Sequence, residues 1–191
     1  MKNAIRWEKY ALIVELADRL KNTSSQFGKT ALQKMIFLLQ EVYNVDLGYK
    51  FDLYTYGPFT SELLQDLDLV ESIGGVKVLP TALGAGGVKG YQILPGERGE
   101  AVKEKAKEFL DKISDSLNNL INNFGHYSAK SLELRSTIVY VAKDMVRSKG
   151  TVDQSELVRI VKEIKPKFSS DDIQKAVTEM MEYIDFGKAA G

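Results

Sequence analysis

The chain has 191 residues, of which 44% are hydrophobic and 27% are charged, as expected for a folded chain of one large domain or two small ones. Lys plus Arg and Asp plus Glu both number 26, and the two halves of the chain are each balanced, so no overall field favours nucleic acid or an anionic membrane. There is no cysteine, which excludes disulfides and thiol catalysis.

No apolar run approaches the roughly 18 residues of a membrane span, and the N-terminal residues lack the apolar stretch of a signal peptide. We therefore expect a cytoplasmic protein that does not bind membranes.

The first part of the chain predicts two helices. Residues 4–21 place Ile5, Leu12, Leu16 and Leu20 near one stripe, which predicts an amphipathic helix. After the polar loop NTSSQFG, hydrophobic residues repeat at three and four positions from about Lys29 to Tyr43 and predict a well-buried second helix.

The segment GYKFDLYTYGPFTSELLQDLD (48–68) predicts a strand followed directly by a helix. Its aromatic alternation is typical of a strand, which Gly57-Pro58 should stop. Thr60 is the expected N-cap of a helix over about 60–73, and Phe59 with Leu64 is expected to form a hydrophobic staple. We expect core packing of the aromatic residues rather than a stacking platform for bases.

Two short strands, 76–79 and 91–94, are predicted to flank the glycine-rich loop PTALGAGGVKG. This loop lacks the Gly-Lys-Ser/Thr ending of a phosphate-binding loop. Gly84, Gly86, Gly87 and Gly90 would form the tip of the hairpin.

The second part of the chain predicts helices only. A nearly heptad seam from Val102 to Phe124 predicts one long helix over 99–124, which could pack within the chain or pair with a second copy in a homodimer. Three helices are expected at about 129–148, 153–164 and 169–186, the last with Ser169 as N-cap.

The predicted elements together indicate a mainly helical α+β fold. Its N-terminal half (1–96) has the element order of a winged helix-turn-helix with a small antiparallel sheet. A long connecting helix (97–126) would join it to a helical C-terminal bundle (127–191) packed on the first part.

Three stretches together, LQKMIFLLQ (32–40), FDLYTYGPFTSELLQDLD (51–68) and LELRSTIVYVA (132–142), resemble the YwgA-like proteins, relatives of the Panacea domain of SocA-like antitoxins. Tyr56, Gly57 and Pro58 match the Tyr-Gly-Pro corner of that family. The resemblance implies a winged-helix fold without a catalytic centre, and a function in neutralising toxins for the Panacea relatives. The glycine-rich hairpin tip departs from the family pattern.

The helix after the corner has carboxylate side chains at the position where a winged helix would contact DNA. We expect its exposed face to include Glu62, Gln65, Asp66 and Glu71, and four carboxylates including Asp68 would repel phosphates. The sequence therefore favours a non-catalytic interaction module, antitoxin-like or adaptor-like, that binds a basic protein partner through this face.

The alternative is a winged-helix DNA-binding regulator. Its candidate nucleic-acid patch consists of Arg159, Lys162, Lys165 and Lys167, although Glu156 and Glu163 also fit a solvated, charge-balanced face. With His126 as the single histidine and no cysteine, the residues predict no metal site, no cofactor and no catalytic residues.

Overall fold

In the computed structural model, residues 2–22, 27–83 and 88–184 are described. Within these ranges the protein is mainly helical, with two small antiparallel sheets of two strands each, which confirms the predicted α+β class. The helices are α1 (Lys2–Leu20), α2 (Lys29–Glu41), α3 (Ser61–Ser72), α4 (Gly99–Glu104), α5 (Lys107–Lys112), α6 (Ser114–Phe124), α7 (Ala129–Lys149), α8 (Gln154–Ile164) and α9 (Ser170–Met180).

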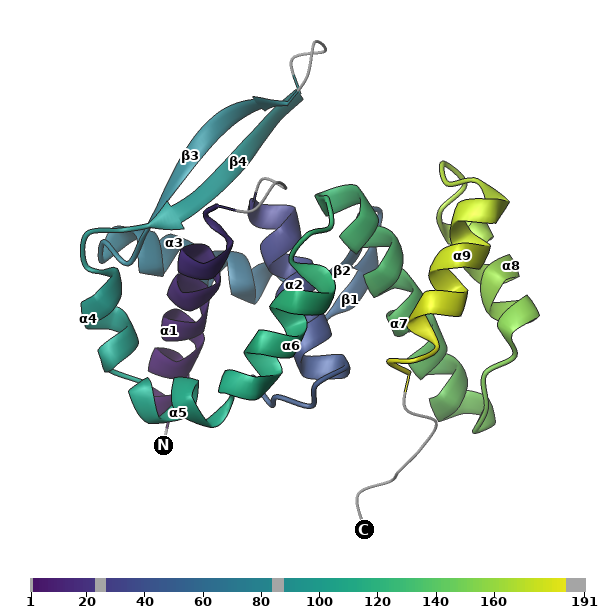
Figure 1. Cartoon of the computed structure of the whole chain (residues 1–191), viewed down its shortest axis with the longest axis horizontal. Helices are drawn as coiled ribbons and strands as arrows, with labels where there is room; N and C mark the ends of the chain where they lie inside the picture. The colour runs from purple at the N-terminus through teal and green to yellow at the C-terminus, as the bar shows by residue number, and fades with distance from the viewer. Residues whose placement is uncertain (1, 23–26, 84–87, 185–191) are drawn as a thin grey trace.

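The core lies around α1, α2 and α7 (Figure 1). Every residue of α2 from Ala31 to Leu39 is buried, because α6, α7, β2 (Gly57–Phe59) and β4 (Val88–Pro95) all contact this helix. The single buried stripe predicted for α1 (Lys2–Leu20) is too narrow. The buried residues of this helix include every position from Lys9 to Val14. Helices buried on all sides are characteristic of the centre of a fold.

The predicted strand before Gly57-Pro58 is instead a short hairpin. Strand β1 (Asp52–Tyr54) pairs antiparallel with β2, and Tyr54 lies opposite Gly57. Gly57-Pro58 therefore begins the second strand of this hairpin instead of ending a single strand.

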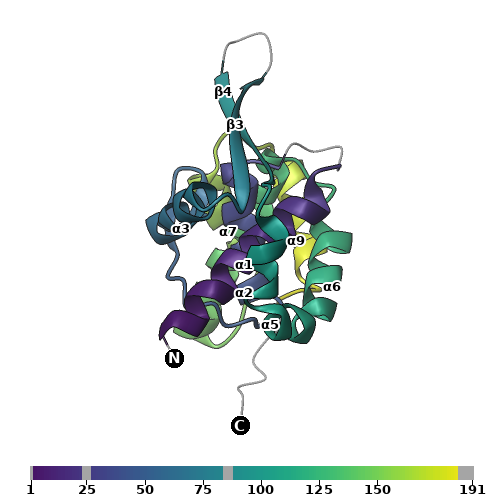
Figure 2. The ribbon, with the colours of Figure 1, turned by 90° about the vertical axis from the view of Figure 1, so that its left-hand side faces the viewer.

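The second hairpin projects from the helical body (Figures 1 and 2). Its strands, β3 (Val76–Leu83) and β4, are longer than predicted and include most of the loop that the glycines suggested. The predicted tip glycines 84, 86 and 87 lie outside the described residues. At the base of the hairpin the Ile93 amide donates to the Phe27 carbonyl (2.8 Å), and a Cβ on Gly28 would lie 2.2 Å from the Tyr91 carbonyl oxygen.

The single helix predicted over 99–124 is wrong, because the chain forms α4, α5 and α6 with breaks at Ala106 and Ile113. Both of these residues are buried, and the breaks let the chain curve around α1 (Figure 1) instead of leaving the body. Within the described residues, the seam expected for a homodimer is largely occupied by this chain's own core, where Leu117, Leu120 and Phe124 are 0% exposed.

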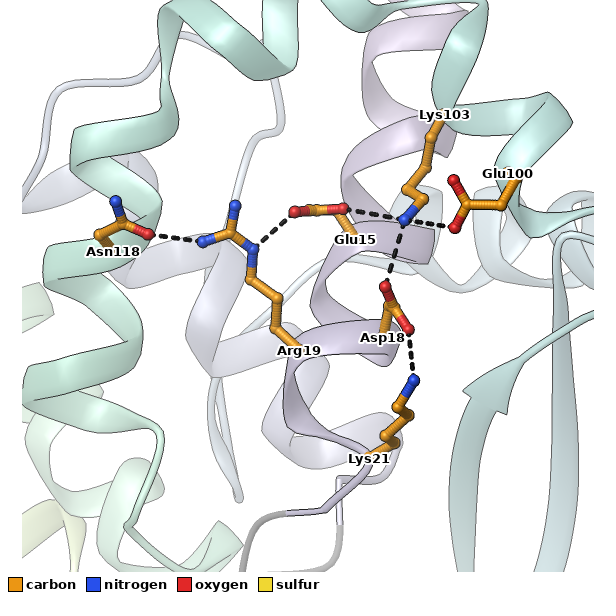
Figure 3. Close-up of polar contacts among 7 residues, drawn as sticks. All are labelled: Glu15, Asp18, Arg19, Lys21, Glu100, Lys103 and Asn118. Atoms are coloured by element: carbon orange, nitrogen blue, oxygen red, sulfur yellow. Dashed lines mark hydrogen bonds and ion pairs between the residues drawn. The ribbon is translucent and has the colours of Figure 1, made fainter.

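A polar network fixes α1 against α4 and α6 (Figure 3). The Lys103 ammonium lies 2.7 Å from a Glu100 oxygen, 3.2 Å from Asp18 and 3.4 Å from Glu15. Arg19 contacts Glu15 at 2.5 Å and the Asn118 side-chain oxygen at 2.7 Å. Burial lowers the pKa of Lys103, but the hydrogen bonds to Glu100 and Asp18 and the charge of Glu15 outweigh it, so the net pKa is raised.

Of the two predicted N-caps, Ser169 forms its capping hydrogen bond and Thr60 does not. The Ser169 hydroxyl accepts the Asp172 amide at 3.0 Å, as predicted for α9, although the helix ends at Met180 and its predicted last residues, 185 and 186, lie outside the described residues. Thr60 occupies the N-cap position of α3, but its side chain accepts no capping hydrogen bond. The sequence also contains two side-chain caps that we did not predict, Ser128 for α7 and Asp153 for α8.

None of the described helices is both long enough and apolar enough to cross a membrane.

Candidate functional site

The Tyr-Gly-Pro corner lies against α7. Gly57 has a φ of 82°, and a Cβ added there would lie 3.0 Å from the Thr137 hydroxyl and 3.3 Å from the Glu133 carbonyl oxygen. Only glycine satisfies both the backbone conformation and the close approach. Gly57 and Pro58 are buried, whereas 67% of Tyr56 is exposed.

Gln33 of α2 makes two hydrogen bonds to the start of α3. Its side-chain amide donates to the Thr60 carbonyl (2.7 Å), and its side-chain oxygen accepts the Thr60 amide (3.0 Å). Both Thr60 backbone groups are thereby satisfied by a residue of α2. The strand-to-helix junction is thus fixed by a tertiary contact rather than by the predicted local cap.

Lys34 is a buried cation that contacts the Tyr-Gly-Pro corner. It is 2% exposed, and its ammonium donates to the Pro58 carbonyl at 2.6 Å. Burial lowers the pKa of Lys34 to about 8. The negative charge of Glu133 opposes this shift, and the positive charge of Lys165 adds to it. Such a shift is the expected effect of burying an ammonium group that has no ion-pair partner among the described residues.

A second buried lysine comes from the connection between α8 and α9. Lys165 is 3% exposed, and its ammonium donates to the Thr55 carbonyl (2.5 Å) and pairs with Glu133 (2.6 Å). The prediction that Lys165 belongs to a nucleic-acid patch is therefore wrong, because its charge is used in the interior. This contact ties the C-terminal helices to the loop of the first hairpin.

A pocket of about 360 Å³ lies beside this group, between α2, the β1–β2 hairpin and α3. Tyr54 and Tyr56, at its edge, are among the most exposed large hydrophobic residues in the described part of the chain. The Tyr54 and Phe59 rings contact each other edge to face, with 5.3 Å between centroids. The residues lining the pocket are Lys29, Thr30, Gln33, Lys34, Tyr54, Thr55, Tyr56, Phe59 and Leu64.

The acidic face of α3 is narrower than predicted. Asp66 is only 8% exposed, because it lies on the same side of the helix as Leu63 and Val70 and accepts a hydrogen bond from the Tyr49 hydroxyl (2.7 Å). Burial raises the pKa of Asp66, although the Tyr49 hydrogen bond and Lys9 oppose it. The prediction that Asp66 belongs to an exposed surface is therefore wrong.

The remaining α3 carboxylates are exposed, but two of them also have structural contacts. Glu62 pairs with the buried Lys9 at 2.6 Å, and a Glu71 oxygen accepts the Val78 amide at 2.8 Å. Gln65 and Asp68 are exposed without such a contact among the described residues. Leu69, 46% exposed, lies on the same helix.

The basic residues around α8 do not form one patch. Arg159 pairs with Glu163 at 2.7 Å, and the Lys162 ammonium donates to the carbonyls of Phe168 (2.6 Å) and Pro166 (3.2 Å). Lys167 is exposed. Lys162 therefore closes the turn before α9, and Arg159 is balanced on its own helix.

Pattern analysis missed Lys34 and Glu133 as members of the site. The one available signal was their position on helices otherwise rich in hydrophobic residues, where a charged side chain needs a partner. Among the described residues no group of histidine, cysteine or carboxylate side chains is placed to hold a metal ion.

Neither a scan against protein-family models nor a search of curated protein sequences found a match for this chain.

Proposed function

We propose that this protein is a non-catalytic interaction module of the winged-helix type that binds a basic protein partner through the exposed face of α3. The order helix, helix, short hairpin, helix, projecting hairpin supports the winged-helix assignment. In such an arrangement α3 takes the place of the recognition helix, and β3–β4 takes the place of the wing.

The observation that carries the proposal is the charge of α3. Its sequence SELLQDLDLVES contains no lysine or arginine, and Glu62, Asp68 and Glu71 are all exposed. A helix that reads DNA supplies cationic and amide donors to phosphates and base edges, whereas carboxylates repel the phosphates. An acidic face that also exposes Leu69 is complementary to a basic protein surface with an apolar centre.

The resemblance to the Panacea-related proteins supports a regulatory role. Antitoxin-like neutralisation or an adaptor function both require a protein partner and no chemistry. DNA binding is the competing function, and the dispersal of the predicted basic patch, with Lys165 buried, gives it less support.

A site-specific photocrosslinker at Gln65 tests the proposal in lysate of the organism that encodes the protein. A crosslinker at Gln174, an exposed residue of α9, is the control. We expect a protein that crosslinks from position 65 and not from position 174. The purified protein should then bind with an affinity reduced about tenfold by Q65K/D68K.

A matched charge change elsewhere, Q174K/E182K, should leave this affinity unchanged. Equal losses for both double variants, or no protein specific to position 65, would refute the assignment of the surface. Binding to duplex DNA, with an affinity that falls steeply as salt rises, would instead favour the DNA-binding function.

A further inference from the structure

The buried group behind the corner carries more positive than negative charge. Lys34 and Lys165 are both buried, and Glu133 is the carboxylate that pairs with Lys165 at 2.6 Å. Lys34 forms no ion pair with any described residue, and the Pro58 carbonyl is its one hydrogen-bond acceptor there. Buried charges in proteins are normally compensated. Because two ammonium groups share one carboxylate here, one positive charge in this group lacks its counterion.

The pocket beside Lys34 provides a place for that counterion. Its walls are mostly apolar and include the rings of Tyr54, Tyr56 and Phe59 together with Leu64. No carboxylate belongs to its lining residues. Its volume of about 360 Å³ lies at the lower end of the range for small-molecule pockets.

Lys29 adds a second cation to the lining. Its ammonium lies 4.4 Å from the centroid of the Tyr91 ring and makes no ion pair with any described residue. Lys29 and Lys34 both belong to α2, and both line the pocket.

We infer that this pocket binds a small apolar carboxylate, with its ring or chain between Tyr54, Tyr56, Phe59 and Leu64 and its carboxylate at Lys34 and Lys29. The carboxylate of such a ligand would supply the counterion that Lys34 lacks among the described residues, and its apolar part matches the walls. The inference concerns a different surface from the exposed face of α3 and does not depend on what α3 binds.

Phosphorylated ligands fit the pocket less well. The lining contains no arginine for bidentate contacts and no glycine-rich loop whose amides could surround a phosphate.

Titration of the ¹⁵N-labelled protein with phenylacetate, followed by NMR, tests the inference. Octanoate replaces the ring with a chain, and phenylacetamide keeps the ring but lacks the charge. We expect saturable shifts of the amides of Lys29, Thr30, Thr55, Tyr56 and Leu64 with at least one of the two carboxylates. Phenylacetamide should bind roughly tenfold or more weakly than phenylacetate, because a charge-assisted hydrogen bond is lost.

Three variants locate the binding. K34M removes the buried cation, L64W fills the pocket without changing either lysine, and K175M removes an exposed lysine of α9 as the control. K34M and L64W should each weaken binding by roughly tenfold or more, while K175M should have no effect.

The L64W variant keeps the test independent of any change that K34M causes in folding. Absence of saturable binding for both carboxylates up to about 10 mM, a range that already includes weak ligands, would overturn the inference. So would equal binding by phenylacetamide, or binding that neither K34M nor L64W weakens.

Discussion

Two clusters of charged residues flank the start of α3, and they differ in charge balance. The acidic cluster contains Lys9, Glu62 and Asp66, with Lys9 paired to Glu62 and Asp66 bonded to the Tyr49 hydroxyl. The basic cluster contains Lys34, Lys165 and Glu133, where Lys165 and Glu133 pair and Lys34 has a carbonyl partner.

The difference shows how the protein accommodates an uncompensated charge. In the acidic cluster the excess carboxylate, Asp66, accepts a hydrogen bond from the Tyr49 hydroxyl, and burial raises its pKa. In the basic cluster the excess ammonium, Lys34, has a lowered pKa and lines a pocket. Lys34 lines a pocket, where we infer that a ligand supplies its counterion, whereas Asp66 has the Tyr49 hydroxyl as its partner.

The largest expected effect comes from removing the single carboxylate of the basic cluster. Glu133→Gln leaves Lys165 and Lys34 without a negative charge, and we expect a loss of about 4 kcal/mol in the free energy of unfolding. Urea denaturation at neutral pH measures it. The double variant E133Q/K165M should recover more than half of the loss, because the unpaired ammonium is removed as well, and no recovery would argue against a buried ion pair.

The next effect concerns the close approach of the corner to α7. Gly57→Ala forces a positive φ on alanine and places its Cβ against Thr137 and Glu133, so we expect a loss of about 3 kcal/mol. Gly48 is a matched control, since its φ is 68° and no atom lies within 4 Å of an added Cβ. Gly48→Ala should cost only about 1 kcal/mol, and equal losses would mean that the packing on α7 contributes nothing.

Lys34→Met should stabilise the protein, with an effect that depends on pH. Because the pKa of Lys34 is lowered from 10.5 to about 8 in the fold, its charged form destabilises the native state below pH 8. That penalty declines as the pH rises from 8 towards 10.5. The stabilisation by K34M should therefore be about 2 kcal/mol smaller at pH 9.5 than at pH 7, as urea denaturation of both proteins would show.

The smallest effect is expected in the acidic cluster. Asp66→Asn keeps an oxygen that accepts the Tyr49 hydroxyl, so the stability should change by less than about 1 kcal/mol at pH 7. Because the pKa of Asp66 is raised, its contribution to stability falls as the pH rises from 3.8 through its folded pKa. Thermal unfolding between pH 4 and pH 7 should show the stability of D66N rising relative to that of the wild type as the pH rises, and a constant difference would contradict the assignment.

Periodicity predicted most of the helices, because burial of an apolar face leaves a local pattern. The extents of α7, α8 and the cap at Ser169 follow from residues close together in the chain. The breaks at Ala106 and Ile113 do not, since they depend on the shape of the core around α1. The apolar residues of the seam continue on both sides of each break, so the pattern alone predicts one unbroken helix.

The candidate site was less predictable because its members are far apart in sequence. Lys165 contacts Thr55 across 110 positions, and Asp66 contacts Tyr49 across 17. Both residues belong to charged stretches that look solvated when read locally. Their burial follows from partners that only the tertiary structure provides, so the pattern placed Asp66 and Lys165 on the surface.

The bond between Lys165 and Thr55 also has a consequence for the order of events during synthesis. Thr55, next to the Tyr-Gly-Pro corner, leaves the ribosome 110 residues before Lys165 does, an interval of roughly 5 to 20 s at ordinary elongation rates. Throughout that interval the loop that carries Tyr56 lacks its anchor from the C-terminal helices. The corner can therefore gain its full set of contacts only after the C-terminal helices have been synthesised, even though it is encoded in the first third of the chain.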